Sequence, residues 1–190
     1  MRITGESFKA DVAGHQMTIV KEDGLYRHLR FSRTDTCNMS FSIITWPGYL
    51  AYVGDMGDYV FARIPDMFEF FRGNSINKSY WAEKVQAECR DGVKEYSPEV
   101  ARAWVEQQLK DYEASEDVRA EAADLDYDNG ECRLYDQLEA IDFNGFSDHW
   151  EANFKEYTER YFWCCFAIVW AIQQYDAAQK PAIQRQAALA

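Results

Sequence analysis

The fold of this chain is indicated most clearly by the segment Ile44-Thr-Trp-Pro-Gly-Tyr-Leu-Ala-Tyr-Val-Gly-Asp-Met-Gly-Asp-Tyr-Val-Phe61. Its Pro47-Gly48 pair fits the two central positions of a type II turn, because glycine takes the positive φ that this turn needs. A second turn signal, Gly54-Asp-Met-Gly-Asp58, separates two apolar runs in the same way. We therefore expect two hairpin turns within an antiparallel sheet.

The sequence before this segment extends the sheet into a meander of about five strands. Asp23-Gly24 is a hairpin signal, and apolar residues alternate with other side chains over residues 25–31. Residues 39–45 continue the period of two. Thr4 can cap a short helix over about residues 5–13, ahead of the first strand.

The sequence from residue 73 onward favours helices. Ser97-Pro98-Glu99 has a hydroxyl at the N-cap, proline at the first helical position and an acid in the first turn. Further helices are expected from Pro65 to Phe71, from Ser79 through Val85, over residues 116–124 and 131–141, and from Ser147 to about Tyr175. The last is apolar on all sides over residues 161–172, which is typical of a helix surrounded by protein, in the core or at a dimer interface.

These patterns predict an α+β fold, in which an N-terminal antiparallel β-meander packs with a C-terminal helical bundle. The expected parts are residues 1–72, a sheet lobe with an N-terminal helix, and residues 73–190, an acidic helical lobe that shares its core. The first part has 8 basic and 9 acidic residues, whereas the second has 12 basic and 23 acidic residues. The net charge of −12 therefore falls almost entirely on the second part.

Charge and hydropathy narrow the classes of function. An acidic chain lacks the basic footprint of a nucleic-acid binder, so we expect no direct binding of DNA or RNA. The longest apolar run has twelve residues, short of the roughly 20 that cross a bilayer, and residues 1–9 lack a signal-peptide core. Five irregularly spaced cysteines favour free thiols in a reducing compartment. We expect a soluble protein of a reducing cytosol.

Residues 111–142 carry the strongest charge signal, with 12 acidic and 2 basic residues. Their acids recur at helical spacing opposite an apolar stripe, which predicts an electronegative surface that docks on a basic partner or competes for a nucleic-acid site. Its net charge of −10 equals the phosphate charge of about 17 Å of duplex DNA, so the surface could replace only a short contact. A C2 dimer would double this surface. A solvated helix face that only keeps the protein soluble is the alternative.

The residues expected to bind the partner come from this acidic stretch and from the aromatic hairpin. They are Glu113, Glu116, Asp117, Glu121, Asp124, Asp126 and Asp128, with Trp46 and Tyr49. The two aromatic residues belong to this set if they lie on an uncovered sheet face, since aromatic side chains anchor interfaces. Tyr52 and Tyr59 belong to the same aromatic segment, and the sequence leaves open which of the four are covered.

Catalytic and metal-binding motifs are weak in this sequence. The three histidines share no metal-ligand spacing, and Asp124-Leu-Asp-Tyr-Asp-Asn-Gly130 departs from a calcium loop because Asn129 stands where glycine is needed. We therefore expect a non-enzymatic protein without a cofactor. The alternative is a divalent-metal hydrolase or nuclease with carboxylates such as Asp55, Asp58, Asp66 and Glu69.

The hairpin segment also carries a resemblance to a known group of proteins. Thr45-Trp-Pro-Gly-Tyr-Leu50, Gly54-Asp-Met-Gly57 and Asp66-Met-Phe-Glu-Phe-Phe71 resemble an uncharacterised family of small acidic bacteriophage and prophage proteins, over about residues 1–72. The family supplies no catalytic residues. The resemblance implies an inhibitor of bacterial defence, such as an anti-CRISPR protein acting as a DNA mimic, and a phage accessory factor that binds replication proteins is a further alternative.

Overall fold

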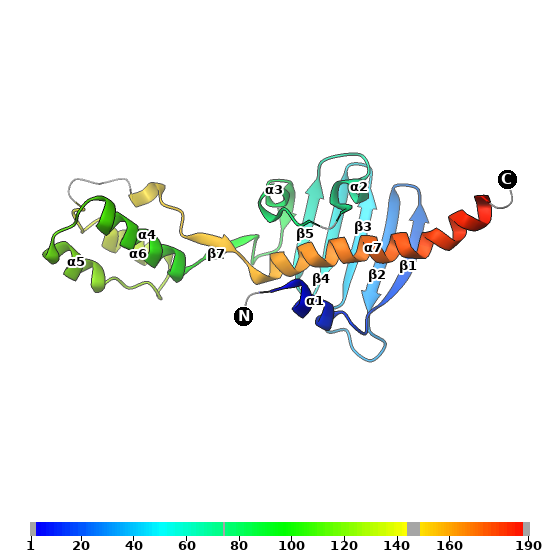
Figure 1. Ribbon diagram of the computed structural model, residues 1–190, viewed down its shortest axis with the longest axis horizontal. Helices are drawn as coiled ribbons and strands as arrows, with labels where there is room; N and C mark the ends of the chain where they lie inside the picture. The colour runs from blue at the N-terminus through cyan, green and yellow to red at the C-terminus, as the bar shows by residue number, and fades with distance from the viewer. Residues whose placement is uncertain (1–2, 74, 144–148, 188–190) are drawn as a thin grey trace. The chain divides into compact units, whose positions relative to one another are not determined.

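The computed structural model describes residues 3–73, 75–143 and 149–187, and it confirms the α+β fold (Figure 1). The chain divides into two compact units. We call Met1–Val93 with Thr158–Ala190 the sheet unit, and Lys94–Tyr157 the acidic module. The division expected at residue 73 therefore differs from the one in the structure, because the last helix belongs to the sheet unit.

The sheet is a six-stranded antiparallel meander in sequence order. Its strands are β1 (Gln16–Asp23), β2 (Tyr26–Ser32), β3 (Phe41–Trp46), β4 (Tyr49–Gly54), β5 (Gly57–Ala62) and β6 (Val85–Glu88). Gly48 has a φ of 87°, as the turn signal predicts. The prediction of a helix through Val85 was wrong: Asn77 rather than Ser79 caps the helix, which ends at Ala82, and Val85 pairs with β5.

Four helices of the sheet unit pack on one face of the sheet, with α7 crossing in front of the strands in Figure 1. They are α1 (Gly5–Asp11), α2 (Met67–Phe71), α3 (Lys78–Ala82) and α7 (Glu159–Ala187). Phe8 of α1 contacts Trp163 of α7 with 5.0 Å between ring centroids, and Phe71 of α2 contacts both Phe61 and Trp81 at 5.2 and 4.8 Å. These contacts form the core of the unit.

The last helix begins later than the sequence predicts. Thr158 accepts the backbone N–H of Tyr161 through its hydroxyl, and α7 starts at Glu159. Ser147, where the helix was expected to begin, lies outside the described residues, and Lys155–Tyr157 form a strand. Within the apolar stretch 161–172, the side chains of Trp163, Cys164 and Ile168 are fully buried, so this helix is a core element of the sheet unit.

The two faces of the sheet differ in exposure. Leu29, Ile43, Tyr52 and Tyr59 lie opposite one another beneath the helices and are at most 1% exposed. The residues that alternate with them point to the other side, where Tyr26 is 51%, Val53 45% and Tyr49 40% exposed. We call this second side the open face.

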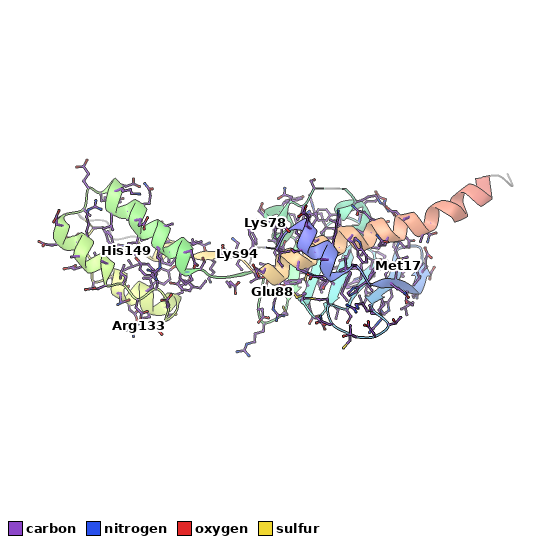
Figure 2. The ribbon with its side chains drawn as sticks, turned by 60° about the horizontal axis from the view of Figure 1, so that its bottom comes forward. Met17, Lys78, Glu88, Lys94, Arg133 and His149 are labelled. Atoms are coloured by element: carbon purple, nitrogen blue, oxygen red, sulfur yellow. The ribbon has the colours of Figure 1, made fainter. Side chains whose placement is uncertain are left out.

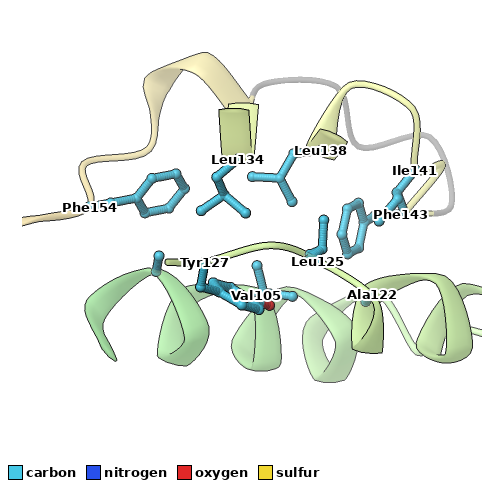
Figure 3. Packing of buried hydrophobic residues seen from close by; sticks show 10 residues of the cluster. Val105, Ala122, Leu125, Tyr127, Leu134, Leu138, Ile141, Phe143 and Phe154 are labelled. Atoms are coloured by element: carbon cyan, nitrogen blue, oxygen red, sulfur yellow. The ribbon is translucent and has the colours of Figure 1, made fainter. Parts of the chain in front are cut away.

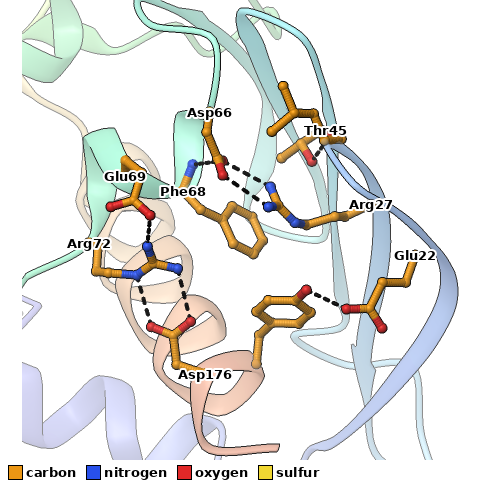
Figure 4. Close-up of polar contacts among 10 residues, drawn as sticks. Glu22, Arg27, Thr45, Asp66, Phe68, Glu69, Arg72 and Asp176 are labelled. Carbon is orange, nitrogen blue, oxygen red and sulfur yellow. Dashed lines mark hydrogen bonds and ion pairs between the residues drawn. The ribbon is translucent and has the colours of Figure 1, made fainter. Parts of the chain in front are cut away.

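A network of polar contacts ties α2 and α7 to the sheet (Figure 4). Arg27 donates two hydrogen bonds of 2.9 Å to Asp66, whose carboxylate also caps α2 by accepting the N–H of Phe68. Arg72 of the α2 C-cap pairs with Asp176 of α7 at 2.9 Å. Burial acts to raise the pKa of Asp66, but the hydrogen bond from Arg27 and the capped N–H outweigh it, so that pKa lies below its usual value.

The acidic module is an insertion in the sequence between β6 and α7. It contains α4 (Pro98–Asp111), α5 (Glu116–Ala123), α6 (Glu131–Leu138), a 3-10 turn, His149–Glu151, and the paired strands β7 (Lys94–Tyr96) and β8 (Lys155–Tyr157). Its own core, shown in Figure 3, is built from Ala101, Val105, Ala122, Leu125, Tyr127, Leu134, Leu138, Ile141, Phe143 and Phe154. The insertion is closed within the sheet unit, where the N–H of Thr158 donates to the carbonyl of Val93 at 3.1 Å.

Candidate partner-binding surface of the acidic module

The acidic module carries the whole net charge of the protein. Figure 2 labels Lys94 at the start of this module and Arg133 and His149 within it. Lys94–Tyr157 contains 18 acidic and 6 basic residues, whereas the sheet unit contains 14 of each. Fold and charge thus coincide: a neutral sheet unit holds an inserted helical module with a net charge of −12. The excess of negative charge therefore lies in this module.

Helix α5 presents the exposed part of this charge. Ser115 caps the helix, and Ala122 is buried in the module core, with Val118 packed against that core. The opposite side of the helix and its two ends are exposed. They carry Glu113, Glu116, Asp117, Glu121 and Asp124, which we call the α5 surface, and none of these forms an ion pair with a residue that the structure describes.

The charges at the C-terminal end of the α5 surface are unfavourable for the helix itself. Glu116 and Asp117 lie in the first turn, where the helix dipole favours acids. Glu121 and Asp124 lie at the other end, where the dipole disfavours them, and the last turn has no basic residue. Asp117 and Glu121 are also four residues apart, a like-charge spacing that costs about 0.2 to 0.5 kcal/mol. A cation bound at the C-terminal end would relieve this repulsion.

Four of the six basic residues of the module bind groups outside the α5 surface. Arg133 pairs with Asp126 at 2.8 Å, Arg102 with Asp128 at 3.8 Å and Lys155 with Glu131 at 3.4 Å. Although Arg119 belongs to α5, its guanidinium donates to the backbone carbonyls of Leu109 and Ala114. None of these four cations therefore pairs with a carboxylate of the α5 surface.

Asp126 and Asp128 differ from the other acids predicted to bind the partner. Helix α5 ends at Ala123, close to the end expected at residue 124, and both residues lie beyond it in the α5–α6 connection. Asp126 accepts a hydrogen bond of 2.6 Å from the Asn129 amide and one of 3.3 Å from the N–H of Asp128. The Asn129 bond, with Arg133 nearby, lowers the pKa of Asp126. The carboxylate of Asp126 therefore holds the turn, whereas that of Asp128 lies near Arg102 of α4.

A hollow lies between α5 and α6 at the C-terminal end of the α5 surface. Its lining residues are Glu121, Asp124, Leu125, Gln137, Ala140 and Ile141. This combination suits the side chain of an arginine or lysine, because the aliphatic part of such a side chain packs on apolar residues while its charged end pairs with carboxylates. The hollow was not foreseen from the sequence, since it depends on how α5 and α6 pack.

The predicted aromatic residues belong to the other unit. Trp46 and Tyr49 lie on the open face of the sheet unit and stack on each other, with ring centroids 5.3 Å apart and planes inclined by 14°. Tyr52 and Tyr59 point to the helix-covered side and are buried. The structure thus assigns the predicted partner-binding residues to two separate units.

Three of the four carboxylates proposed for a metal-dependent enzyme have other partners, and the fourth, Asp55, is exposed. Asp66 binds Arg27, Glu69 pairs with Arg72, and Asp58 accepts the N–H of Gly54 at 3.2 Å. Across the described ranges, no three His, Cys, Asp or Glu side chains are grouped so that they could hold a metal ion. The alternative function, a divalent-metal hydrolase or nuclease, therefore gains no support from this geometry.

Comparisons with known proteins give no further guidance. No family model matches the chain, and no curated protein or solved structure is significantly similar to it. Among the described helices, none has the length and apolar character needed to cross a bilayer. Charge and geometry are therefore the only observations that bear on the function of this surface.

Proposed function

We propose that the protein is a non-enzymatic binding protein whose α5 surface docks on a basic protein surface that otherwise holds nucleic acid. The observation that carries the proposal is the set of exposed, uncompensated acids on one helix of a folded module. Because such a surface repels itself, its charge is best satisfied by a cationic partner. The hollow beside Glu121 and Asp124 supplies a place for one arginine or lysine of that partner.

The size of the α5 surface defines the kind of nucleic-acid contact that it can replace. Its five acids correspond to about 8.5 Å of duplex DNA, given roughly one charge per 1.7 Å of axis. This matches a few phosphates in a narrow basic groove. We therefore propose competition at a short phosphate-binding groove rather than imitation of a long duplex.

The resemblance of residues 1–72 to phage proteins suggests the first class of partner to test. We propose a nucleoprotein complex of bacterial defence, so that the protein acts in the bacterial cytoplasm as an anti-CRISPR-like inhibitor. A partner from phage replication would present a similar basic groove to the same surface. A competition experiment with each class separates the two.

The experiment measures how the protein displaces target DNA from purified RNA-guided effector complexes, at low and high salt. A variant with Glu116→Lys, Asp117→Lys, Glu121→Lys and Asp124→Lys reverses most of the α5 surface. The matched control reverses four exposed acids elsewhere in the module, Glu95→Lys, Glu106→Lys, Glu151→Lys and Glu156→Lys, with the same change in net charge. Circular dichroism checks that both variants remain folded.

The proposal predicts that the wild type displaces DNA and that high salt weakens it. The α5 variant should need at least about 30-fold more protein, since four lost contacts of about 0.5 kcal/mol each amount to roughly 2 kcal/mol. The control variant should stay close to the wild type. Equal loss in both variants would mean that only total charge matters. Displacement unchanged by the α5 variant would refute the proposed surface.

A further inference from the structure

The open face of the sheet unit is a second candidate interface, unrelated to the charge of the acidic module. Its side chains form rows across the strands, and the central strands contribute mostly apolar ones. Each row consists of residues that pair across neighbouring strands. The first row holds Trp46, Tyr49 and Ala62, with Tyr26 beside it on β2, and the second holds Lys21, His28, Ile44, Ala51, Val60 and Ala87. The third row holds Thr18, Arg30, Ser42, Val53 and Asp58. Three large apolar side chains of this face, Tyr26, Tyr49 and Val53, are between 40% and 51% exposed, and neighbouring exposed apolar side chains typically mark an interface.

The charges of the open face argue against a nucleic-acid platform. A surface that stacks bases on aromatic rings also needs an excess of cations to follow the backbone. Here Lys21 and Arg30 are balanced by Asp23 and Asp58 on the same face. A neutral face that carries both signs suits a protein surface with the same balance.

The positions of Arg30 and Asp58 point to a specific partner. They stand in the same row, on β2 and β5, at equal distances from the boundary between β3 and β4. Both side chains are exposed, and neither forms an ion pair with a described residue. A two-fold axis that runs parallel to the strands above this boundary would lay β2 of one copy over β5 of the other. Each Arg30 would then face the Asp58 of the second copy.

We propose that the open face binds a second copy of this chain around such a two-fold axis, which forms a dimer with two sheets packed face to face. The geometry corresponds to aligned sheet packing, in which two faces lie about 10 Å apart and interdigitate. The interface is isologous, because both copies use the same rows. None of its residues belongs to the acidic module, so the inference stands apart from the proposed function.

Over much of the face the same axis matches larger side chains with smaller ones, while in the first row it lays Trp46 over Tyr49 of the second copy. Ile44 on β3 would meet Ala51 on β4 of the second copy, and Val53 would meet Ser42. Tyr26 on β2 would lie over Ala62 on β5. Large side chains that face small ones let two sheet faces interdigitate without voids. Charge and shape therefore support one and the same arrangement.

The dimensions of the face set the expected strength of the dimer. Six strands spaced by about 4.8 Å extend over about 24 Å, and rows that span five residues of about 3.4 Å each extend over about 17 Å. A flat face of this size has roughly 400 Å² on each copy. This is smaller than the roughly 800 Å² per partner of a standard interface. A reversible dimer with a micromolar dissociation constant is expected.

A charge-swap experiment on the full chain tests this arrangement. Arg30→Asp and Asp58→Arg are made separately and studied by sedimentation velocity from low to several hundred micromolar, alone and mixed. Each variant alone would place like charges opposite each other across the two-fold axis, so its dissociation constant should rise at least about tenfold. In the mixture, the introduced aspartate of one variant faces the introduced arginine of the other, and the native Asp58 faces the native Arg30. Heterodimers should therefore form with near wild-type affinity.

Two further variants define the readout. Tyr49→Glu puts an acid at the centre of the aromatic row and should give monomers, whereas Arg90→Asp changes an exposed arginine outside the face and should dimerise like the wild type. A wild type that stays monomeric throughout the range would overturn the proposal, and so would dimers that none of the face variants weakens. Binding of a single-stranded oligonucleotide by the monomer, lost in Tyr49→Glu, would assign the face to nucleic acid instead.

Discussion

Replacing Asp66 with asparagine isolates the charge of the ion pair beneath α2. Asparagine can still cap the helix by accepting the N–H of Phe68, but it cannot neutralise Arg27. Exposed ion pairs contribute about 0 to 1 kcal/mol, and breaking a buried pair costs about 3 to 5 kcal/mol. The Arg27 and Asp66 side chains are 11% and 24% exposed, which places this pair between those cases. We expect Asp66→Asn to lower the free energy of unfolding of the sheet unit by about 2 to 3 kcal/mol.

Urea unfolding followed by tryptophan fluorescence measures this change. The matched control is Asp35→Asn, which breaks the Arg33–Asp35 pair, whose side chains are 45% and 63% exposed. That control should cost less than about 0.5 kcal/mol. A loss below about 0.5 kcal/mol in Asp66→Asn, equal to that of the control, would show that the buried pair does not hold α2 to the sheet.

The pH dependence gives a second check on the same carboxylate. Because the pKa of Asp66 is lower in the folded protein, the pair stabilises the fold above the unfolded pKa of about 3.8. That contribution is lost as the pH falls through the folded pKa. The difference between the wild type and Asp66→Asn should therefore be full at neutral pH and shrink below about pH 4. A difference that stays constant down to about pH 2 would contradict the assigned cause.

Two other predictions concern the cores. Leu134→Ala should destabilise the acidic module by about 2 to 5 kcal/mol, because Leu134 is fully buried, while hydrogen exchange in the sheet unit stays unchanged. Equal loss of protection in both units would show that they unfold together. Burial raises the pKa of Cys165 to about 12, so at about pH 8 a thiol reagent should label the exposed Cys37 and Cys132 rapidly but reach Cys164 and Cys165 only after denaturation. Rapid labelling of all four in the native protein would refute that burial.

Local signals in the sequence predicted much of the fold. The Pro47-Gly48 turn and the start of α4 at Ser97-Pro98 both depend on a few adjacent residues, and both are confirmed. The late start of α7 and the strand β6 depend on pairing between distant segments. The hydrogen bond from Thr158 to Val93 that closes the insertion is of this kind, and periodicity carries no signal for it.

The candidate surface was predictable in composition but not in detail. The exposure of Glu116, Asp117 and Glu121 follows from their place opposite the apolar stripe of α5. The engagement of Asp126 by Asn129 and Arg133 depends on how the α5–α6 connection folds, and acidic spacing alone cannot separate such a turn residue from a docking residue. Because side chains alternate between the two faces of a strand, the sequence of β3 and β4 correctly indicated that some aromatic residues lie on the side away from the core. Which side the helices cover became clear only from the tertiary structure.

The acidic module alone should be sufficient to bind the partner. Displacement of DNA by the isolated segment Lys94–Tyr157 tests this most directly. Circular dichroism first establishes that it folds, as its own buried core predicts. The folded module should displace DNA from the same effector complex as the full chain does, with the same salt dependence. A folded module that fails to compete where the full chain succeeds would contradict it.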